Sequence, residues 1–243
     1  MFGQIARRYD FLNHFLSAGI DVYWRSKTAR AVNPERAGPI LDVCTGTGDL
    51  AIALRKRLGA KRSIVGTDFT HEMLVLAKRK VERIAGEEIV LLESDAQALP
   101  FADQQFAAVT VAFGLRNVTD THLGLREMIR VCQPGGEVFV LEFSQPEAPL
   151  FGSVYRWYFR NVLPRIGQLL ARNRQSAYEY LPESVGEFPS GRALVAIMEE
   201  CDLANVSHTP MTLGIATLYR GQKPTGLDAN EAQTASDLVG ASQ

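Results

Sequence analysis

The chain has 243 residues, 46% of them hydrophobic, which is enough to bury the core of an α/β domain. Its 26 basic and 27 acidic residues give a formal net charge of −1, so no overall field attracts nucleic acid or an anionic membrane. The sequence has neither an apolar run long enough to span a bilayer nor a signal-peptide pattern at its start. We therefore expect a cytoplasmic protein that makes only peripheral contact with a membrane.

The cysteines and histidines predict no metal site. Cys44, Cys132 and Cys201 lie in apolar segments without CxxC spacing, which indicates reduced cysteines of the core. The four histidines are scattered along the chain without the spacing of metal ligands: His14, His71, His122 and His208.

Residues 1–33 precede the first strand and are predicted to form two helices. Apolar side chains recur every three or four residues from Phe2 to Leu16 and again, after Gly19, from Trp24 to Ala31. The polar groups within residues 9–13 leave two interpretations open. These helices are either ordinary packed helices or a lid over the mouth of a cofactor site.

The strongest local signal is the stretch from Ile40 to Leu50. An apolar run opens it and predicts a buried strand, and a short turn then leads to Gly48. Gly46 and Gly48 have no Cβ, so the backbone can turn sharply and a ligand can lie against it. Asp49 is predicted to cap the next helix, whose free amides suit polar or anionic ligand groups. The pattern predicts a strand, a glycine turn and a helix that bind a nucleoside-bearing cofactor.

Two classes of cofactor fit this turn. Gly46-x-Gly48-x-x-Ala51 matches the dinucleotide fingerprint, and Asp68, after the next apolar run, can accept ribose hydroxyls in either class. Asp42 lies inside the first strand, and an acid there is similar to the first motif of S-adenosylmethionine-dependent methyltransferases. The alternative for Asp42 is that it only ties down the loop backbone.

A third apolar run, residues 89–92, predicts another buried strand. It leads to Asp95 and Ala96 and then to Leu99-Pro100-Phe101. An acid and a small residue followed by this turn resemble the adenine-binding segment of methyltransferases. There the carboxylate accepts a hydrogen bond from the adenine amino group, and the next amide donates to the ring.

Residues 106–112 predict a fourth strand, and residues 113–118 the loop at its carboxyl end. Ligands of open α/β sheets bind outside the carboxyl ends of the strands. Arg116 and Asn117 on this loop are therefore expected to face the site, with a loop tied down by its own polar groups as the alternative.

A helix is expected from about Thr119 to the turn Pro134-Gly135-Gly136, followed by a fifth strand over residues 138–144. Glu142 lies inside that apolar strand. Because a buried glutamate is costly unless it is paired, it has either a structural partner or a place in the substrate pocket.

Residues 150–180 interrupt the alternation of strands and helices. They contain seven aromatic residues and five arginines but a single acid, Glu179. This composition favours a helical lid with an apolar inner wall and a rim at the membrane interface over an RNA-binding segment. A packed helix pair or a homodimer contact is the alternative. A helix over 190–201 and two closing strands near 204–220 follow, and residues 223–243 are predicted to be a disordered tail.

With these segments placed, the chain closely resembles the ubiquinone/menaquinone biosynthesis C-methyltransferase family, which includes demethylmenaquinone methyltransferases, from about Phe2 to Lys223. The loop over 113–118 favours this family over methyltransferases at large. The segments that carry the resemblance are Tyr9-Asp10-x-x-Asn13-x-x-x-Ser17-x-Gly19 with Trp24, Thr45-Gly46-Thr47-Gly48-Asp49-Leu50, Ala98-Leu99-Pro100-Phe101, Phe113-Gly114-Leu115-Arg116-Asn117-Val118, Pro134-Gly135-Gly136, Leu141-Glu142-Phe143-Ser144 and Leu163-Pro164-Arg165-Ile166-Gly167.

The resemblance implies a class I methyltransferase fold: a Rossmann-like, seven-stranded sheet whose last strand is antiparallel, with N-terminal helices and an inserted helical lid. Residues 1–222 would form one domain. The cofactor implied is S-adenosylmethionine, and the substrate is a polyprenylated quinol of menaquinone or ubiquinone biosynthesis. The residues implied to bind the cofactor are Asp42, Gly46, Thr47, Gly48, Asp68, Asp95, Ala96 and Ala112, and the catalytic candidates are Arg116, Asn117 and Glu142.

Four positions depart from the pattern of the family. Leu12 stands where methionine is usual, Asp21 where histidine is frequent, and Gln133 where lysine is common. Ala112 stands where some members have a serine that contacts the cofactor, so only its backbone can serve here.

The implied reaction transfers a methyl group from a sulfonium to a ring carbon. A quinol carbon becomes nucleophilic when the neighbouring hydroxyl ionises, which costs about 4 kcal/mol at pH 7 if the pKa is near that of tyrosine. Arg116 is the candidate cation that stabilises the phenolate. The base stays open among Glu142, Asp10, His14, a tyrosine of residues 150–180 and water. A binding protein without methyl transfer and an NAD-dependent oxidoreductase are the alternatives, and the sequence does not choose between naphthoquinol and benzoquinol.

Overall fold

The computed structural model describes residues 19–60, 62–83, 89–144, 146 and 186–225. Several predicted features lie outside the described residues: the first helix with its motif from Tyr9 to Ser17, the segment 150–180, and the chain after residue 225. The division into one domain over 1–222 and a tail therefore stays a prediction.

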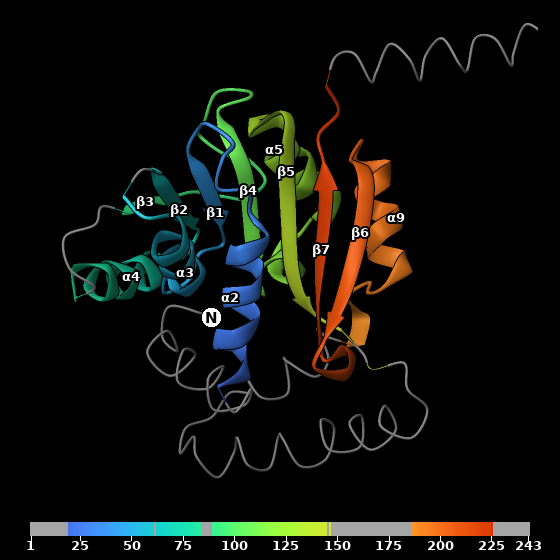
Figure 1. Ribbon diagram of the computed structural model, residues 1–243, viewed down its shortest axis with the longest axis horizontal. Helices are drawn as coiled ribbons and strands as arrows, with labels where there is room; N and C mark the ends of the chain where they lie inside the picture. Colours follow the sequence, from blue (N-terminus) through green and yellow to red (C-terminus); the bar gives the residue numbers. More distant parts are fainter. Residues whose placement is uncertain (1–18, 61, 84–88, 145, 147–185, 226–243) are drawn as a thin grey trace, which may run out of the picture.

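Seven strands form one sheet in the order β3-β2-β1-β4-β5-β7-β6 (Figure 1). Strands β1 to β5 run parallel to one another, whereas β7 is antiparallel to both β5 and β6. This confirms the predicted seven-stranded fold with a reversed last strand. The strands are β1 (Ile40–Val43), β2 (Ile64–Asp68), β3 (Ile89–Glu93), β4 (Phe106–Ala112), β5 (Cys132–Phe143), β6 (Ala204–Met211) and β7 (Ala216–Gln222).

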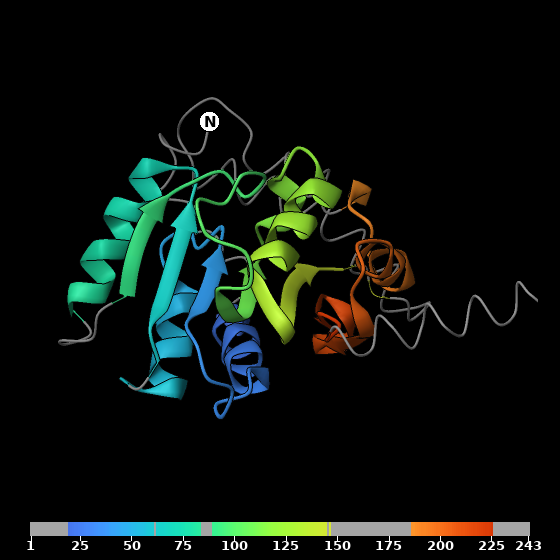
Figure 2. The ribbon, with the colours of Figure 1, turned by 90° about the horizontal axis from the view of Figure 1, so that it is seen from above.

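Helices cover both faces of the sheet (Figures 1 and 2). Two of them, α2 and α3, share one hydrophobic cluster with β1, β4 and β5, and Val81 of α4 packs against the same cluster. On the opposite face, α5 and α9 pack against the sheet in a second cluster. The helices are α2 (Ile20–Ala31), α3 (Asp49–Leu58), α4 (His71–Arg83), α5 (Thr121–Val131) and α9 (Arg192–Glu200), with 3-10 turns η1 (Leu115–Asn117) and η2 (Thr212–Gly214).

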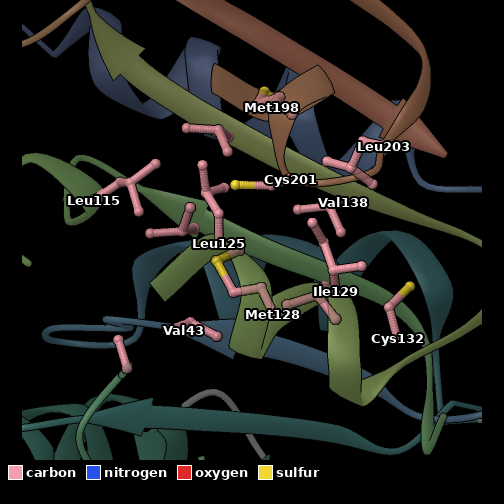
Figure 3. Close-up of a cluster of buried hydrophobic side chains, with 14 of the residues drawn as sticks. Val43, Leu115, Leu125, Met128, Ile129, Cys132, Val138, Met198, Cys201 and Leu203 are labelled. Carbon is pink, nitrogen blue, oxygen red and sulfur yellow. The ribbon is translucent and has the colours of Figure 1, made fainter. Parts of the chain in front are cut away.

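Successive side chains of a strand point to opposite faces of the sheet, so each strand contributes to both hydrophobic clusters. Leu41 and Val43 of β1 belong to the cluster with α5 and α9, while Ile40 belongs to the cluster with α2 and α3. In the same way Val138 and Phe139 of β5 lie in opposite clusters. Figure 3 shows the cluster with α5 and α9, in which Val43 and Val138 of the sheet lie with side chains of these helices: Leu125, Met128, Ile129 and Met198.

The predicted strand over residues 89–92 exists, but it is not buried. It lies at the edge of the sheet, paired only with β2 among the described strands, and Val90 and Leu92 are 57% and 39% exposed. A short apolar run does not distinguish an edge strand from a central one, which explains the difference.

Two boundaries also differ from the expected ones. The helix predicted to reach Pro134 ends at Val131, because Cys132 opposite Phe106 already opens β5. Lys223, predicted as the first residue of a disordered tail, is held in place. Its Nζ donates to the carbonyls of Ile129, Arg130 and Cys132 at 2.8–3.2 Å and so caps the end of α5.

Candidate active site

A cavity of about 320 Å³ opens at the carboxyl ends of β1, β2, β3 and β4. These strands lie side by side, and the chain order changes direction between β1 and β4. Such a switch point is where open α/β sheets bind ligands. Seven of the eight residues predicted to bind the cofactor line this cavity: Asp42, Gly46, Thr47, Asp68, Asp95, Ala96 and Ala112.

Asp42 both lines the cavity and ties the site together. Its carboxylate accepts hydrogen bonds from Thr45 Oγ1 at 2.6 Å and from Thr110 Oγ1 at 2.8 Å, so it joins the glycine turn to β4. The side chain is buried, and burial raises its pKa to about 6, although the two hydroxyls and the charge of Arg25 act in the opposite direction. Asp42 therefore ties the glycine turn to β4 and also lines the cavity.

Asp68 holds the glycine turn from the neighbouring strand. Its two carboxylate oxygens accept hydrogen bonds from the amides of Gly46 at 2.8 Å and Thr70 at 2.9 Å, and burial raises its pKa. Gly46 has φ +57°, and a Cβ built there would meet nothing within 4 Å. The backbone at Gly46 thus faces open space in the cavity, as close approach of a ligand requires.

Gly48 does not line the cavity. It has φ +85°, and a Cβ added there would lie 3.3 Å from Cβ of Ala77. This glycine therefore allows the turn into α3 and its close packing on α4. It also takes the cap position predicted for Asp49, which is the first residue of α3 and accepts a hydrogen bond from Lys80 Nζ at 2.9 Å.

Thr47, Asp95 and Ala96 are brought together around the cavity as predicted. Thr47 Oγ1 accepts a hydrogen bond from Lys80 Nζ at 2.7 Å. Asp95 follows β3, and its Oδ1 accepts from the amide of Gln97 at 2.9 Å, which fixes the carboxylate at the cavity wall. Ala112 ends β4, and its methyl side chain leaves only backbone groups for polar contact.

Two of the three catalytic candidates lie outside the cavity lining. Glu142 accepts a hydrogen bond from Arg116 Nη1 at 2.5 Å, with the two side chains 1% and 2% exposed. Arg116 Nη1 also donates to the carbonyl of Phe113 at 2.7 Å. This pair gives Glu142 the partner that a buried glutamate needs. Asn117, one residue further, does line the cavity.

The sequence analysis missed Arg25 of α2, which lines the cavity together with Phe113. Periodicity drew attention to the apolar side of this helix and not to a buried arginine. The available signal was Asp21 four residues earlier, at the spacing of a helical ion pair, and Arg25 does pair with Asp21.

The cavity also contains two strained residues. Cys44, after β1, and Phe113, after β4, have φ of +52° and +58° although neither is glycine. A Cβ added at Gly114 would lie 2.4 Å from Cβ of Cys44, so these two turns touch. Burial and nearby carboxylates, Asp68 foremost, raise the pKa of the Cys44 thiol, which argues against a nucleophilic thiolate. Among the described residues, no His, Cys, Asp and Glu cluster could hold a metal ion.

Comparison with known proteins points to one family. The model of the ubiE/COQ5 methyltransferase family matches residues 1–223. A ubiquinone/menaquinone biosynthesis C-methyltransferase UbiE of Geotalea daltonii is 48% identical over 225 residues, which cover 92% of this chain and 94% of the relative. A demethylmenaquinone methyltransferase of Thermus thermophilus is 47% identical over 225 residues, with 92% and 100% covered.

Solved structures show the same fold at low sequence identity. A SAM-dependent methyltransferase of Thermotoga maritima, described as a possible histamine N-methyltransferase, superposes with a TM-score of 0.65 at 17% identity. That match covers 91% of this chain and 97% of the other. At such identity the likeness supports the class I methyltransferase fold and nothing about the substrate.

Replacing Asp42 by asparagine is expected to change how stability depends on pH. The folded protein keeps the Asp42 proton up to a pKa of about 6, above the usual 3.8, so the contribution of Asp42 to the unfolding free energy falls as pH rises between these values. The Asp42→Asn variant has no carboxyl that ionises, so its unfolding free energy relative to that of wild type should rise by about 2 kcal/mol from pH 4 to pH 7. Urea unfolding of both proteins at the two pH values measures this difference in unfolding free energy. Glu72→Gln, which changes an exposed side chain of α4, is the control. A difference independent of pH would contradict the prediction.

Proposed function

The chain belongs to the ubiE/COQ5 methyltransferase family, and from this premise we propose that it methylates a ring carbon of a polyprenylated quinol at the cavity described above. It is an S-adenosylmethionine-dependent C-methyltransferase of quinone biosynthesis. The observation that carries the proposal is the meeting of Asp68, Asp95 and the open turn at Gly46 in one cavity at the switch point of the sheet.

The described residues fit S-adenosylmethionine. Each oxygen of the Asp68 carboxylate accepts one backbone hydrogen bond, and the Thr70 side chain also bonds to it, which leaves a lone pair for a ribose hydroxyl. Asp95 and the amide of Ala96 are assigned to the adenine amino group and ring. The cofactor supplies a methyl group already activated on a sulfonium, so the protein has to hold the quinol carbon in line and help its hydroxyl to ionise.

We assign the quinol oxygen to the loop after β4. Asn117 lines the cavity and can orient the hydroxyl or a water that carries its proton. Arg116 does not line the cavity, so its guanidinium, which stays ionised, would stabilise the phenolate charge from behind this loop. Its pairing with Glu142 and with the Phe113 carbonyl means that it also fixes the loop carrying Asn117. An experiment must therefore separate these two roles.

The base is not assigned. Glu142 is 1% exposed and is occupied as a structural partner. Its Oε1 accepts hydrogen bonds from Arg116 Nη1 and from the amide of Phe143, and its Oε2 accepts from the amide of Arg116 at 3.4 Å. Asp10, His14 and the tyrosines of residues 150–180 lie outside the described residues. Water at the mouth of the cavity is the remaining candidate.

Two experiments test the proposal: one measures the activity, and the other identifies the ring of the substrate. Purified protein should transfer the methyl group of S-adenosylmethionine to a soluble quinol analogue. NAD(H) should not compete with S-adenosylmethionine for binding to the protein. The absence of transfer would favour a binding protein, although neither this alternative nor an oxidoreductase is supported by the relatives. Mass analysis of quinones from cells lacking the protein, with and without restoration, distinguishes naphthoquinol from benzoquinol.

Asp68→Ala should weaken binding of S-adenosylmethionine and of its demethylated product. The variant loses charge-assisted hydrogen bonds worth about 1.5–3 kcal/mol, which corresponds to roughly 10- to 150-fold in affinity. Isothermal calorimetry measures the change. Asp103→Ala, which removes an exposed carboxylate bound to Arg130, is the matched control. An unchanged affinity of Asp68→Ala would move the ribose contact elsewhere.

Arg116→Lys should depress methyl transfer at least tenfold while cofactor affinity stays within about threefold of wild type, since one ammonium replaces a planar fork of donors. Arg130→Lys, in an ion-paired arginine of α5 away from the cavity, is the control. Full turnover by Arg116→Lys would remove Arg116 from the mechanism. If Asn117→Ala loses as much as Arg116→Lys and the double variant loses no more, Arg116 acts by positioning the loop.

A finer proposal concerns the membrane. No helix of the described residues is long and apolar enough to cross a bilayer, yet a polyprenyl tail has to enter from lipid. We propose a cytoplasmic protein that contacts the inner face of the membrane transiently through residues 150–180, with aromatic side chains at the headgroup level and arginines at the phosphates. Val22 and Tyr23, which are 57% and 51% exposed on α2, add apolar surface.

Liposome flotation and turnover of long-tailed and short-tailed quinols test this contact. Trp157→Ala and Arg160→Glu should reduce flotation and long-tail activity and spare the short tail. Binding should also weaken as salt rises, because each basic residue near an anionic surface adds only about 1 kcal/mol. If both variants behave as wild type, the segment serves packing or a homodimer contact instead, which light scattering would detect.

A further inference from the structure

We propose that Arg25 binds the carboxylate of the methionine moiety of the cofactor and that Asp21 holds its guanidinium in place, an inference that rests on the proposed function. The sequence motifs account for the adenine and ribose ends of the ligand only. The amino-acid end carries an ammonium and a carboxylate, and a carboxylate that leaves bulk water needs a partner such as a cation.

The strand order fixes the direction in which the ligand lies. Asp95 follows β3, Asp68 ends β2, Asp42 lies in β1 and Ala112 ends β4, and these strands are neighbours in that order. With adenine at Asp95 and ribose at Asp68, the rest of an extended ligand reaches the ends of β1 and β4. Arg25 lies there, since its guanidinium carbon is 5.3 Å from the ring centroid of Phe113, just after β4.

The charges of the cavity point to the same residue. Arg25 is the only basic residue among the described residues that line this cavity, whereas four carboxylates line it: Asp42, Asp49, Asp68 and Asp95. A ligand carboxylate placed near β1 would be repelled by Asp42 and needs a cation next to it. The field of Arg25 reaches Asp42, because its charge acts to lower the pKa of that carboxyl.

Arg25 is prepared for such contact by its surroundings. It is 9% exposed and pairs through Nη1 with Asp21, which is 2% exposed, one helical turn earlier in α2. A guanidinium presents five N–H donors in one plane, so a second carboxylate can bind the nitrogens that do not face Asp21. Packing on the Phe113 ring further fixes the plane of the guanidinium group.

Two ligands that differ only in the carboxylate test the proposal. S-adenosylhomocysteine contains it, and the decarboxylated analogue S-adenosyl-3-thiopropylamine lacks it. We expect wild type to bind S-adenosylhomocysteine more tightly, and Arg25→Gln to weaken that binding by roughly 10- to 100-fold. Affinity for the decarboxylated analogue should change less than about threefold. Arg25→Lys should restore part of the loss, because it restores the charge without the fork.

Calorimetry with both ligands, and thermal unfolding of each variant, separate binding from folding. Arg30→Gln, an exposed arginine on the same helix, is the matched control. Equal losses for the two ligands in Arg25→Gln, or equal affinities in wild type, would overturn the role of Arg25 and leave the proposed function intact. Failure of wild type to bind either ligand would overturn the proposed function and this inference with it.

Discussion

The site depends on one buried carboxylate. Asp42 is 1% exposed in the middle of the sheet, where an ionised group is costly unless its oxygens are satisfied. Hydrogen bonds from Thr45 and Thr110 meet that need, and in doing so they fix the glycine turn to β4. Asp68 then holds the turn from the other side through the amide of Gly46. The shape of the cavity thus follows from how two carboxylates are solvated by the protein.

Two buried ion pairs likewise support the turn at the carboxyl end of β4. Arg25 with Asp21 and Arg116 with Glu142 are buried pairs, and both arginines contact Phe113, one at its ring and the other at its carbonyl. Phe113 has positive φ, a conformation that persists only where the surroundings determine it. The arginines hold this strained turn between them. Charge pairing and backbone strain therefore support each other at the carboxyl end of β4.

The sequence predicted those parts of the fold that local pattern controls. The apolar run of β4, the turn after β1, and the spacing of Asp68 and Asp95 predicted strand ends that the structure brings together around one cavity. Contacts between distant segments were not predictable. Arg25 reaches the cavity only because α2 packs beside α3, and Glu142 meets Arg116 across 26 positions. The edge position of β3 likewise depends on strand order, which an apolar run does not encode.

The position of β7 between β5 and β6 has a consequence for how the protein folds. This strand pairs with β5 on one side and β6 on the other, and β6 pairs with no other described strand. Residues 216–222 follow both of these partner strands in the sequence, so until β7 pairs, the sheet has an open edge at β5, and β6 with α9 has no strand to join it to the rest. Unpaired backbone groups at such an edge invite association with other chains. Insertion of β7 between β5 and β6 is therefore the step that closes this part of the sheet.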